Sequence, residues 1–438
     1  MKIFLLSLFV ILTACGRATD AVIDTTTEAI IEETIATIPP GTLYSNPNQP
    51  FLDDLDILID ILQNNFGSLG TALHDKGFDI ISDITALQNK IYNDDNFTVI
   101  DFYRYLTEMT MQVHPVAHFW FLPFPQNHPL VTEAMYAEHV AAADSAIASI
   151  TNVDLERFDY YRGLYLQARP SISHRSITEG QVALLTINSM HPVISSGGNQ
   201  WNDIVAGVAD FYYHIQDYQH LIIDLRGNGG GSPAIFHDLV LHPLLPDGHH
   251  IQFDMYLFTP TGEIIQPFIE EPLSPINLQL AQNLWNTSTA LIPTADILAQ
   301  AYLPELILAN VENLPYGIPL QFSLRASSPP RFRDVQYTGK LWLLIDENVS
   351  SAGHMAAYIA RESGMFTLVG NTTGGNFAGN GIRARATLPH SRLVFQFDPF
   401  LLVDSRGRST EAGILPHYFN KDGMDALDTA LMLIAQGD

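Results

Sequence analysis

Two adjacent serines, Ser350 and Ser351, lie between a short apolar run, residues 340–346, and a helical pattern that starts at Ala352. A serine on a tight turn between a strand and a helix is the arrangement of an activated nucleophile. The first amides of such a helix can stabilise an oxyanion beside the hydroxyl. Serine is also a preferred N-cap residue, so either hydroxyl could simply cap the helix. The turn therefore suggests acyl-transfer chemistry, with helix capping as the alternative.

A glycine-rich stretch, LIIDLRGNGGG at residues 221–231, follows a second apolar run. Glycine permits positive φ and lets a ligand approach the main chain, so the stretch could be a tight turn, a phosphate loop or an oxyanion hole. A phosphate loop is excluded because no GK[ST] follows the glycines. Within the stretch, Asp224 and Arg226 favour a structural ion pair that braces the turn over a catalytic role.

The composition limits the partners of the chain. Of 438 residues, 47% are hydrophobic and 16% are charged, which is typical of a globular protein of two to three domains. Asp and Glu (47) outnumber Lys and Arg (21), and the net charge is −26. This charge argues against nucleic acid or an anionic membrane surface as the main partner.

The N-terminus predicts export. The sequence MKIFLLSLFVILTACG has one lysine, an apolar run of signal-peptide length and the only cysteine of the chain, Cys15. The stretch Leu12-Thr13-Ala14-Cys15 resembles the lipobox of bacterial lipoproteins, in which the cysteine is lipidated. An ordinary secretory signal with an incidental cysteine is the alternative. Both interpretations export the protein, and the lipoprotein interpretation places it in the cell envelope, anchored by lipid to the periplasmic or extracellular face of a bacterial membrane.

The remaining chain divides by its patterns. We expect a lipoprotein signal peptide and lipidated cysteine at 1–15, a flexible tether at 16–45, an N-terminal helical domain at 46–125, a helical connector at 126–178, and an α/β domain at 179–438 with an insertion at about 255–335. In the α/β domain, short apolar runs such as HLIIDL, KLWLLID and FTLVGN alternate with helical patterns at 202–217, 233–243 and 352–363. This alternation predicts a partly parallel sheet with crossover helices.

Four motifs in fixed order resemble the tail-specific, or C-terminal-processing, serine peptidases, which are related to the tricorn core and to retinoid-binding repeats. They are LIIDLRGNGGG (221–231), SSAGHMAAYIA (350–360), VGNTTGGN (369–376) and TEAGILPH (410–417). The resemblance implies a ClpP/crotonase-like core and a serine peptidase activity that needs no cofactor and no metal. Two positions depart from the family pattern: His354 stands where relatives carry Glu, and His417 where they carry Asp.

The resemblance also assigns residues. The nucleophile would be Ser351, with Ser350 as the neighbour that could be confused with it. The oxyanion donors would be the amides of Gly229 or Gly230 and of Ala352.

The base is assigned by the same resemblance. One branch of the family uses a lysine after the serine, but no lysine occurs from 341 to 420, which excludes that dyad. The tricorn-like branch uses an N-terminal histidine and a late glutamate, which match His118 and Glu411, with His114 as the second choice for the base. Relatives place a polar residue before the histidine, where this chain has Ala117. We therefore expect Glu411 or a backbone carbonyl to orient the imidazole.

Three functions remain to be distinguished. The preferred one is an exported, lipid-anchored serine peptidase acting on peptide or protein substrates. The second is a non-catalytic lipoprotein of the same fold that binds a peptide or apolar ligand. The third is a metal-dependent hydrolase using His114 and His118; Pro115 between them and the absence of an H-E-x-x-H glutamate argue against it.

Overall fold

The computed structural model describes residues 46–113, 116–122, 172–190, 200–265, 285–287, 291–300, 306–326, 330–375 and 384–437. The predicted leader with Cys15, the tether, His114 and most of the predicted helical connector lie outside these ranges. No helix in the described part of the chain has the length and hydropathy needed to cross a bilayer.

A six-stranded sheet forms the α/β part, with strand order β14-β10-β9-β4-β3-β2. Its strands are β14 (Tyr418–Phe419), β10 (Phe366–Gly370), β9 (Lys340–Ile345), β4 (His220–Asp224), β3 (Val182–Ile187) and β2 (Ile172–Thr178). All neighbours are parallel except β2 and β3. The predicted partly parallel α/β core is confirmed. Residues 172–178 form a strand, so the last part of the predicted helical connector is wrong: their backbone pairs antiparallel with β3 as the edge strand of the sheet.

Helices cover both faces of this sheet. The helices are α8 (Gln200–Ile215), α9 (Pro233–Phe236), π-helix η2 (His237–Leu241), α10 (His242–Leu244), α15 (Ala352–Glu362) and α16 (Ala426–Gln436). In β4, Leu221 and Ile223 pack in one core with α8 and α15, whereas Ile222 packs in another with α16. Strands that bury both faces need apolar residues at every position, which explains their continuous apolar runs.

A second sheet occupies much of the predicted insertion. Its order is β13-β5-β8-β6, from β13 (Leu401–Asp404), β5 (His250–Thr259), β8 (Tyr316–Arg325) and β6 (Trp285–Thr287), with β7 (Ile292–Pro293) also pairing with β8. Helices α13 (Thr294–Gln300) and α14 (Leu306–Val311) pack near it. The sequence suggested helical patches in this region. The described residues instead form two ten-residue strands, β5 and β8. Along most of each strand buried and less buried residues alternate, which is the period-two pattern of a strand rather than the spacing of a helix.

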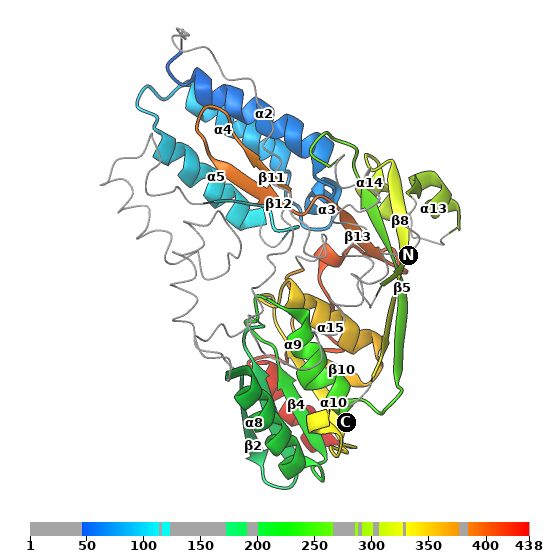
Figure 1. Ribbon diagram of the computed structural model, residues 1–438. Helices are drawn as coiled ribbons and strands as arrows, with labels where there is room; N and C mark the ends of the chain where they lie inside the picture. Colours follow the sequence, from blue (N-terminus) through cyan, green and yellow to red (C-terminus); the bar gives the residue numbers. More distant parts are fainter. Residues whose placement is uncertain are drawn as a thin grey trace, which may run out of the picture.

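The N-terminal helices do not build their core alone. The helices are α2 (Gln49–Asn65), α3 (Leu69–His74), α4 (Ile80–Tyr92) and α5 (Val99–Val113). A small antiparallel sheet joins β1 (Trp120–Phe121) to β12 (Val394–Phe397) and β11 (Ala384–Thr387). Phe395 and Phe397 of β12 are fully buried among the helices. Figure 1 shows these helices at one end of the molecule and the six-stranded sheet at the other.

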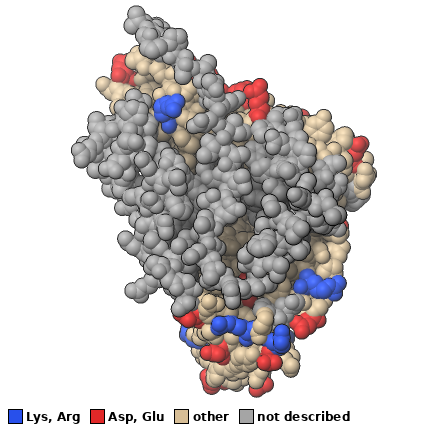
Figure 2. Space-filling model, viewed as in Figure 1, with Lys and Arg blue, Asp and Glu red and all other residues tan. Residues whose placement is uncertain are grey.

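Figure 2 shows the charged side chains on one face of the molecule. On the face in Figure 2, the coloured basic side chains are few, and several of them lie beside acidic ones at the lower end, over the six-stranded sheet. The coloured part of this face therefore has no broad basic field of the kind that binds nucleic acid.

Candidate active site

Ser351 lies on a strained turn between β9 and α15. Its φ of 53° and ψ of −124° are rare for a residue with a side chain. The Ser351 amide donates to the carbonyl of Gly375 (3.0 Å), and the Ser351 carbonyl accepts from Met355 (2.9 Å). The main chain is therefore held on both sides of the residue. This geometry presents the hydroxyl at the N-terminus of α15, as in a nucleophile elbow.

Ser350 is engaged elsewhere. Its hydroxyl donates to the carbonyl of Gly229 (3.3 Å), and its amide donates to the carbonyl of Asn228 (3.0 Å). Ser350 thus ties the serine turn to the glycine loop, and of the two serines it is Ser351 that lies beside a histidine.

The histidine is His118, which is 6% exposed. Its Nε2 lies 3.2 Å from Ser351 Oγ, and its Nδ1 lies 2.5 Å from a carboxylate oxygen of Asp398. A proton on Nδ1 donated to Asp398 leaves Nε2 as the acceptor for the serine hydroxyl. The three side chains form a continuous hydrogen-bonded chain with the order of a Ser-His-Asp triad.

Asp398 is the residue that the sequence reading missed. We expected Glu411 or a carbonyl to orient the imidazole, and this expectation is wrong, because the group on Nδ1 is the Asp398 carboxylate. Asp398 follows β12 directly and is 1% exposed. The only local signal is an acidic residue at the end of the apolar stretch LVFQF, which no motif marks.

Glu411 acts on the backbone of the histidine turn. Ala117 and His118 both have φ of 47°. The fully buried Glu411 carboxylate accepts from the Ala117 amide (2.8 Å), while the Ala117 carbonyl accepts from the Asp398 amide (2.6 Å). Two contacts thus hold a pair of residues in an unfavourable conformation. Nearby, burial lowers the pKa of Lys76, an effect that the negative charge of Glu411 opposes.

The amides that were expected to form the oxyanion hole differ in their hydrogen bonds. Gly230 was a candidate oxyanion donor, but its amide donates to the Asn228 side chain (2.8 Å). The amides of Gly229 and Ala352 donate to no residue that the structure describes. Gly230 serves a different purpose: a Cβ there would lie 2.7 Å from Ser351 Cβ, and its φ is 104°. Glycine at this position lets the loop approach the serine.

The turn after β4 is braced as expected. Arg226 donates to both carboxylate oxygens of Asp224 (2.9 and 2.7 Å) and also contacts Asp425 (2.9 Å). Asp224 raises the pKa of Arg226 through hydrogen bonds, so the guanidinium stays charged. The pair has a structural geometry, since its hydrogen bonds close the turn after β4 and tie it to Asp425.

The two histidines that depart from the family pattern are both tied into the structure. His354 is fully buried one turn into α15, with Nδ1 2.8 Å from Thr373 Oγ1, and burial lowers its pKa to about 3. His417 Nδ1 accepts from the Leu368 amide (2.9 Å), and its own amide donates to the Leu368 carbonyl (2.8 Å). Burial lowers the pKa of His417 as well. Both imidazoles therefore act as neutral packing and hydrogen-bonding groups.

Within the described ranges, no group of three or more His, Cys, Asp or Glu side chains could hold a metal ion. His114, the second member of the considered metal pair, lies outside those ranges, and so does Cys15.

The family model of Peptidase family S41 matches residues 181–419, which is more than half of the chain. The fold is similar to that of mature CPAF complexed with lactacystin, with 13% sequence identity, a TM-score of 0.51, and coverage of 89% of this chain and 98% of that one. A CPAF mutant matches with 15% identity and a TM-score of 0.51, over 85% of this chain and 93% of that one. No curated protein matches the chain.

A third solved structure, the photosystem II D1 C-terminal processing protease, matches over 87% of this chain and 94% of its own, at 12% identity and a TM-score of 0.35. The match of the Peptidase family S41 model to residues 181–419 confirms, at the level of the family, the resemblance based on the four motifs.

Proposed function

We propose that this chain, which belongs to Peptidase family S41, is a serine peptidase with Ser351 as nucleophile and His118 as base. Asp398 would orient the base. The observation that carries the proposal is the contact chain from Ser351 Oγ to His118 Nε2 (3.2 Å) and from His118 Nδ1 to Asp398 (2.5 Å).

Acylation would begin when His118 takes the Ser351 proton and the serine oxygen attacks the peptide carbonyl. Asp398 would stabilise the imidazolium formed in this step. The carbonyl oxygen becomes an oxyanion, and the amides of Gly229 and Ala352 are the donors available to it. The positive end of α15 adds to this stabilisation because Ala352 is its first residue.

His118 would then return the proton to the leaving amine, and the C–N bond breaks to give an acyl-enzyme. A water molecule, deprotonated by the same imidazole, would attack the ester and release the new carboxylate. Serine is restored in the second step. Glu411 has a positioning role in this scheme, since its carboxylate accepts from the Ala117 amide and so holds the turn that carries His118. The chemistry needs no metal and no organic cofactor.

We further propose that the protein is exported and anchored by a lipid on Cys15, acting on peptides or proteins in the cell envelope. The support is the sequence of residues 1–16, with its apolar run and lipobox-like LTAC. Metabolic labelling with a radioactive fatty acid tests it: the wild-type protein should be labelled and Cys15→Ser should not. Equal labelling of both would contradict the anchor.

A fluorophosphonate probe tests the peptidase proposal. Protein lacking residues 1–15 should be labelled at Ser351, as mapped by mass spectrometry of the peptides. Labelling should disappear in Ser351→Ala and His118→Ala and persist in Ser350→Ala. Folded wild-type protein that stays unlabelled from pH 6 to 9 would sink the proposal and favour the non-catalytic binding protein instead.

A further inference from the structure

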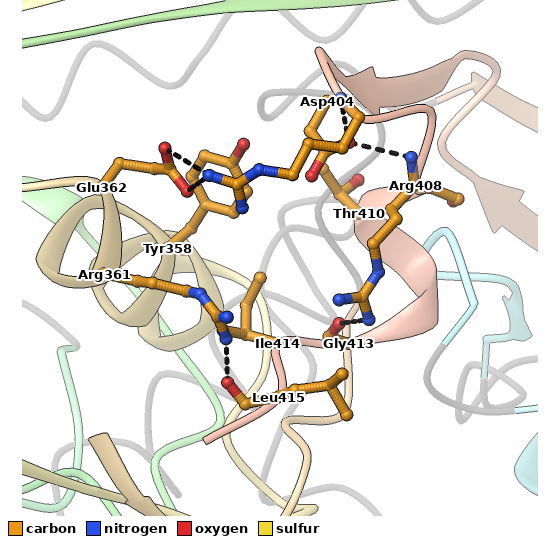
Figure 3. Close-up of a pocket in the computed structure, with 11 residues that line it drawn as sticks. Tyr358, Arg361, Glu362, Asp404, Arg408, Thr410, Gly413, Ile414 and Leu415 are labelled. Atoms are coloured by element: carbon orange, nitrogen blue, oxygen red, sulfur yellow. Dashed lines mark hydrogen bonds and ion pairs between the residues drawn. The ribbon is translucent and has the colours of Figure 1, made fainter. Parts of the chain in front are cut away.

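A pocket away from Ser351 gathers three arginines. It is a small pocket, partly open to solvent, with a cavity volume of about 20 Å³, and it lies between the C-terminal half of α15 and residues 404–415. Arg361 enters from α15, and Arg406 and Arg408 come from the segment after β13. Figure 3 shows the guanidinium groups of Arg361 and Arg408 reaching in from opposite walls. In a chain with 21 basic and 47 acidic residues, such a gathering calls for a physical reason.

The acidic residues of the pocket are already engaged. Glu362 pairs with Arg406 (3.0 Å). One oxygen of Asp404 accepts from the backbone amides of Arg406 (2.9 Å) and Arg408 (2.8 Å), which shapes the turn. These contacts leave no carboxylate of a described residue within ion-pair distance of Arg361 or Arg408.

Among the residues that the structure describes, Arg361 and Arg408 donate only to backbone carbonyls. The acceptors are Leu415 for Arg361 and Gly413 (3.4 Å) for Arg408. A guanidinium has five N–H donors, and one carbonyl accepts from only a few of them, so further donors are left for a ligand. Burial and the neighbouring charges of Arg406 and Arg408 lower the pKa of Arg361. The charged form of Arg361 is thus disfavoured where it stands, and an anion would relieve the repulsion.

The pocket also offers a neutral donor. Tyr358 is 6% exposed, and burial together with Asp404 and Glu362 raises the pKa of its phenol. The hydroxyl therefore keeps its proton. A pocket with two unmatched guanidiniums and one phenol carries the donors that a planar or tetrahedral oxyanion accepts.

We propose that this pocket binds a small oxyanion, either a carboxylate or a phosphate, held by Arg361 and Arg408. Both arginines also hold carbonyls of residues 413–415, so the bound anion would fix these residues in place. Glu411, which contacts the Ala117 amide, lies two residues before Gly413. The binding claim does not depend on the peptidase proposal.

Calorimetric titration tests the site directly. Sodium phosphate and sodium acetate are titrated separately into the purified protein, with sodium chloride at equal ionic strength as the blank. We expect saturable binding of one anion per chain, with a dissociation constant of about 1 mM or tighter, a free energy of about −4 kcal/mol or stronger. Binding of phosphate, of acetate or of both supports the site and identifies its ligand class. No saturable heat with either anion would overturn it.

Substitutions distinguish anion binding in the pocket from non-specific attraction to positive charge. Arg361→Gln and Arg408→Gln should each weaken binding at least tenfold. Arg325→Gln is the matched control, because Arg325, exposed at the end of β8, also donates to a carbonyl, that of Gly248 (3.2 Å). Arg408→Lys keeps the charge without the guanidinium fork and serves if the Gln variant does not fold. Unchanged affinity in both pocket variants, or equal loss in Arg325→Gln, would refute the proposal.

Discussion

The two halves of the candidate site are built in different ways. Ser351 and the glycine loop belong to adjacent parallel strands, β9 and β4, whose carboxyl ends meet at one edge of the six-stranded sheet. His118 and Asp398 come from turns 280 residues apart, next to β1 and β12 of the small antiparallel sheet. The nucleophile is thus positioned by a regular sheet, whereas the base is positioned by hydrogen bonds between two segments that are far apart in the sequence.

This difference separates local from long-range causes. A strand, a turn and a helix within about 20 residues position Ser351, so a substitution in these elements should affect mainly the nucleophile. The base depends on β12 joining the core of the N-terminal helices, where Phe397 packs against Phe66 with ring centroids 5.5 Å apart. Damage to that packing should move Asp398 and His118 together, without disturbing the elbow.

The largest effect should come from the base half. Asp398→Asn should slow labelling of Ser351 by about 10³- to 10⁴-fold, because an amide no longer fixes the proton on Nδ1 or stabilises the imidazolium. The measurement is the rate of fluorophosphonate labelling, with the fold checked by circular dichroism. Asp254→Asn, on the exposed side of β5, is the matched control. Equal rates in the two variants would mean that the triad geometry carries no chemistry.

On the nucleophile half, Gly230→Ala should combine two penalties. The new Cβ would lie 2.7 Å from Ser351 Cβ, and φ at this position is 104°. We expect a loss of about 1–3 kcal/mol in the free energy of unfolding and more than a tenfold slower labelling rate. Gly207→Ala on α8, where the nearest atom is 3.9 Å away, should stabilise by about 0.5–1 kcal/mol instead. Urea unfolding measures both, and a neutral Gly230→Ala would show that the close approach is unimportant.

The same contrast explains what the sequence could predict. The strands β3, β4, β9 and β10 and the serine turn were visible because each is written in consecutive residues with a clear period and turn chemistry. His118 came from a family resemblance, not from periodicity. Asp398 could not be found, because its role depends on β12 pairing with β1, and pairing between strands so far apart leaves no local pattern.

The second sheet was missed for a related reason. Residues 250–259 alternate as a strand, but their partners at 316–325 lie beyond a long stretch rich in Pro and Leu. Helical spacing in NLQLAQNLWN drew the interpretation toward helices. Whether residues 277–284 of that stretch are helical stays a prediction, because they lie outside the described residues.

Glu411→Gln should slow labelling of Ser351 less than Asp398→Asn does, if the contact between Asp398 and His118 is the one that the chemistry needs. The substitution weakens a charge-assisted hydrogen bond to Ala117 and leaves Lys76 without its opposing charge. We expect a loss of about 1.5–3 kcal/mol in the free energy of unfolding and a labelling rate reduced by roughly tenfold. Glu347→Gln is the control, since Glu347 is exposed and, among the described residues, its carboxylate accepts only from the Asn371 side chain (3.1 Å). A loss as large as that of Asp398→Asn would make Glu411 part of the chemistry.

The last prediction concerns acid stability and again separates the two halves of the site, because the sensitive group, His354, lies on the nucleophile side. Burial lowers its pKa from 6.5 to about 3, so the unfolded chain binds a proton that the folded protein does not. The stability from neutral His354 is fully present above pH 6.5 and is lost as pH falls toward 3. The free energy of unfolding should therefore fall by about 1.4 kcal/mol per pH unit from this group.

His237, whose pKa burial lowers to about 4, should add a similar slope over a shorter range. Urea unfolding between pH 7 and 4.5 measures the total for the wild type and for His354→Gln. Because Gln does not titrate, the slope of the free energy of unfolding against pH should be smaller in His354→Gln by the contribution of one proton. We expect this even if the variant is less stable at every pH. If the slope of the free energy of unfolding against pH is the same in wild type and variant, His354 must become protonated within the folded state. The turn at Ser351 would then tolerate a buried positive charge.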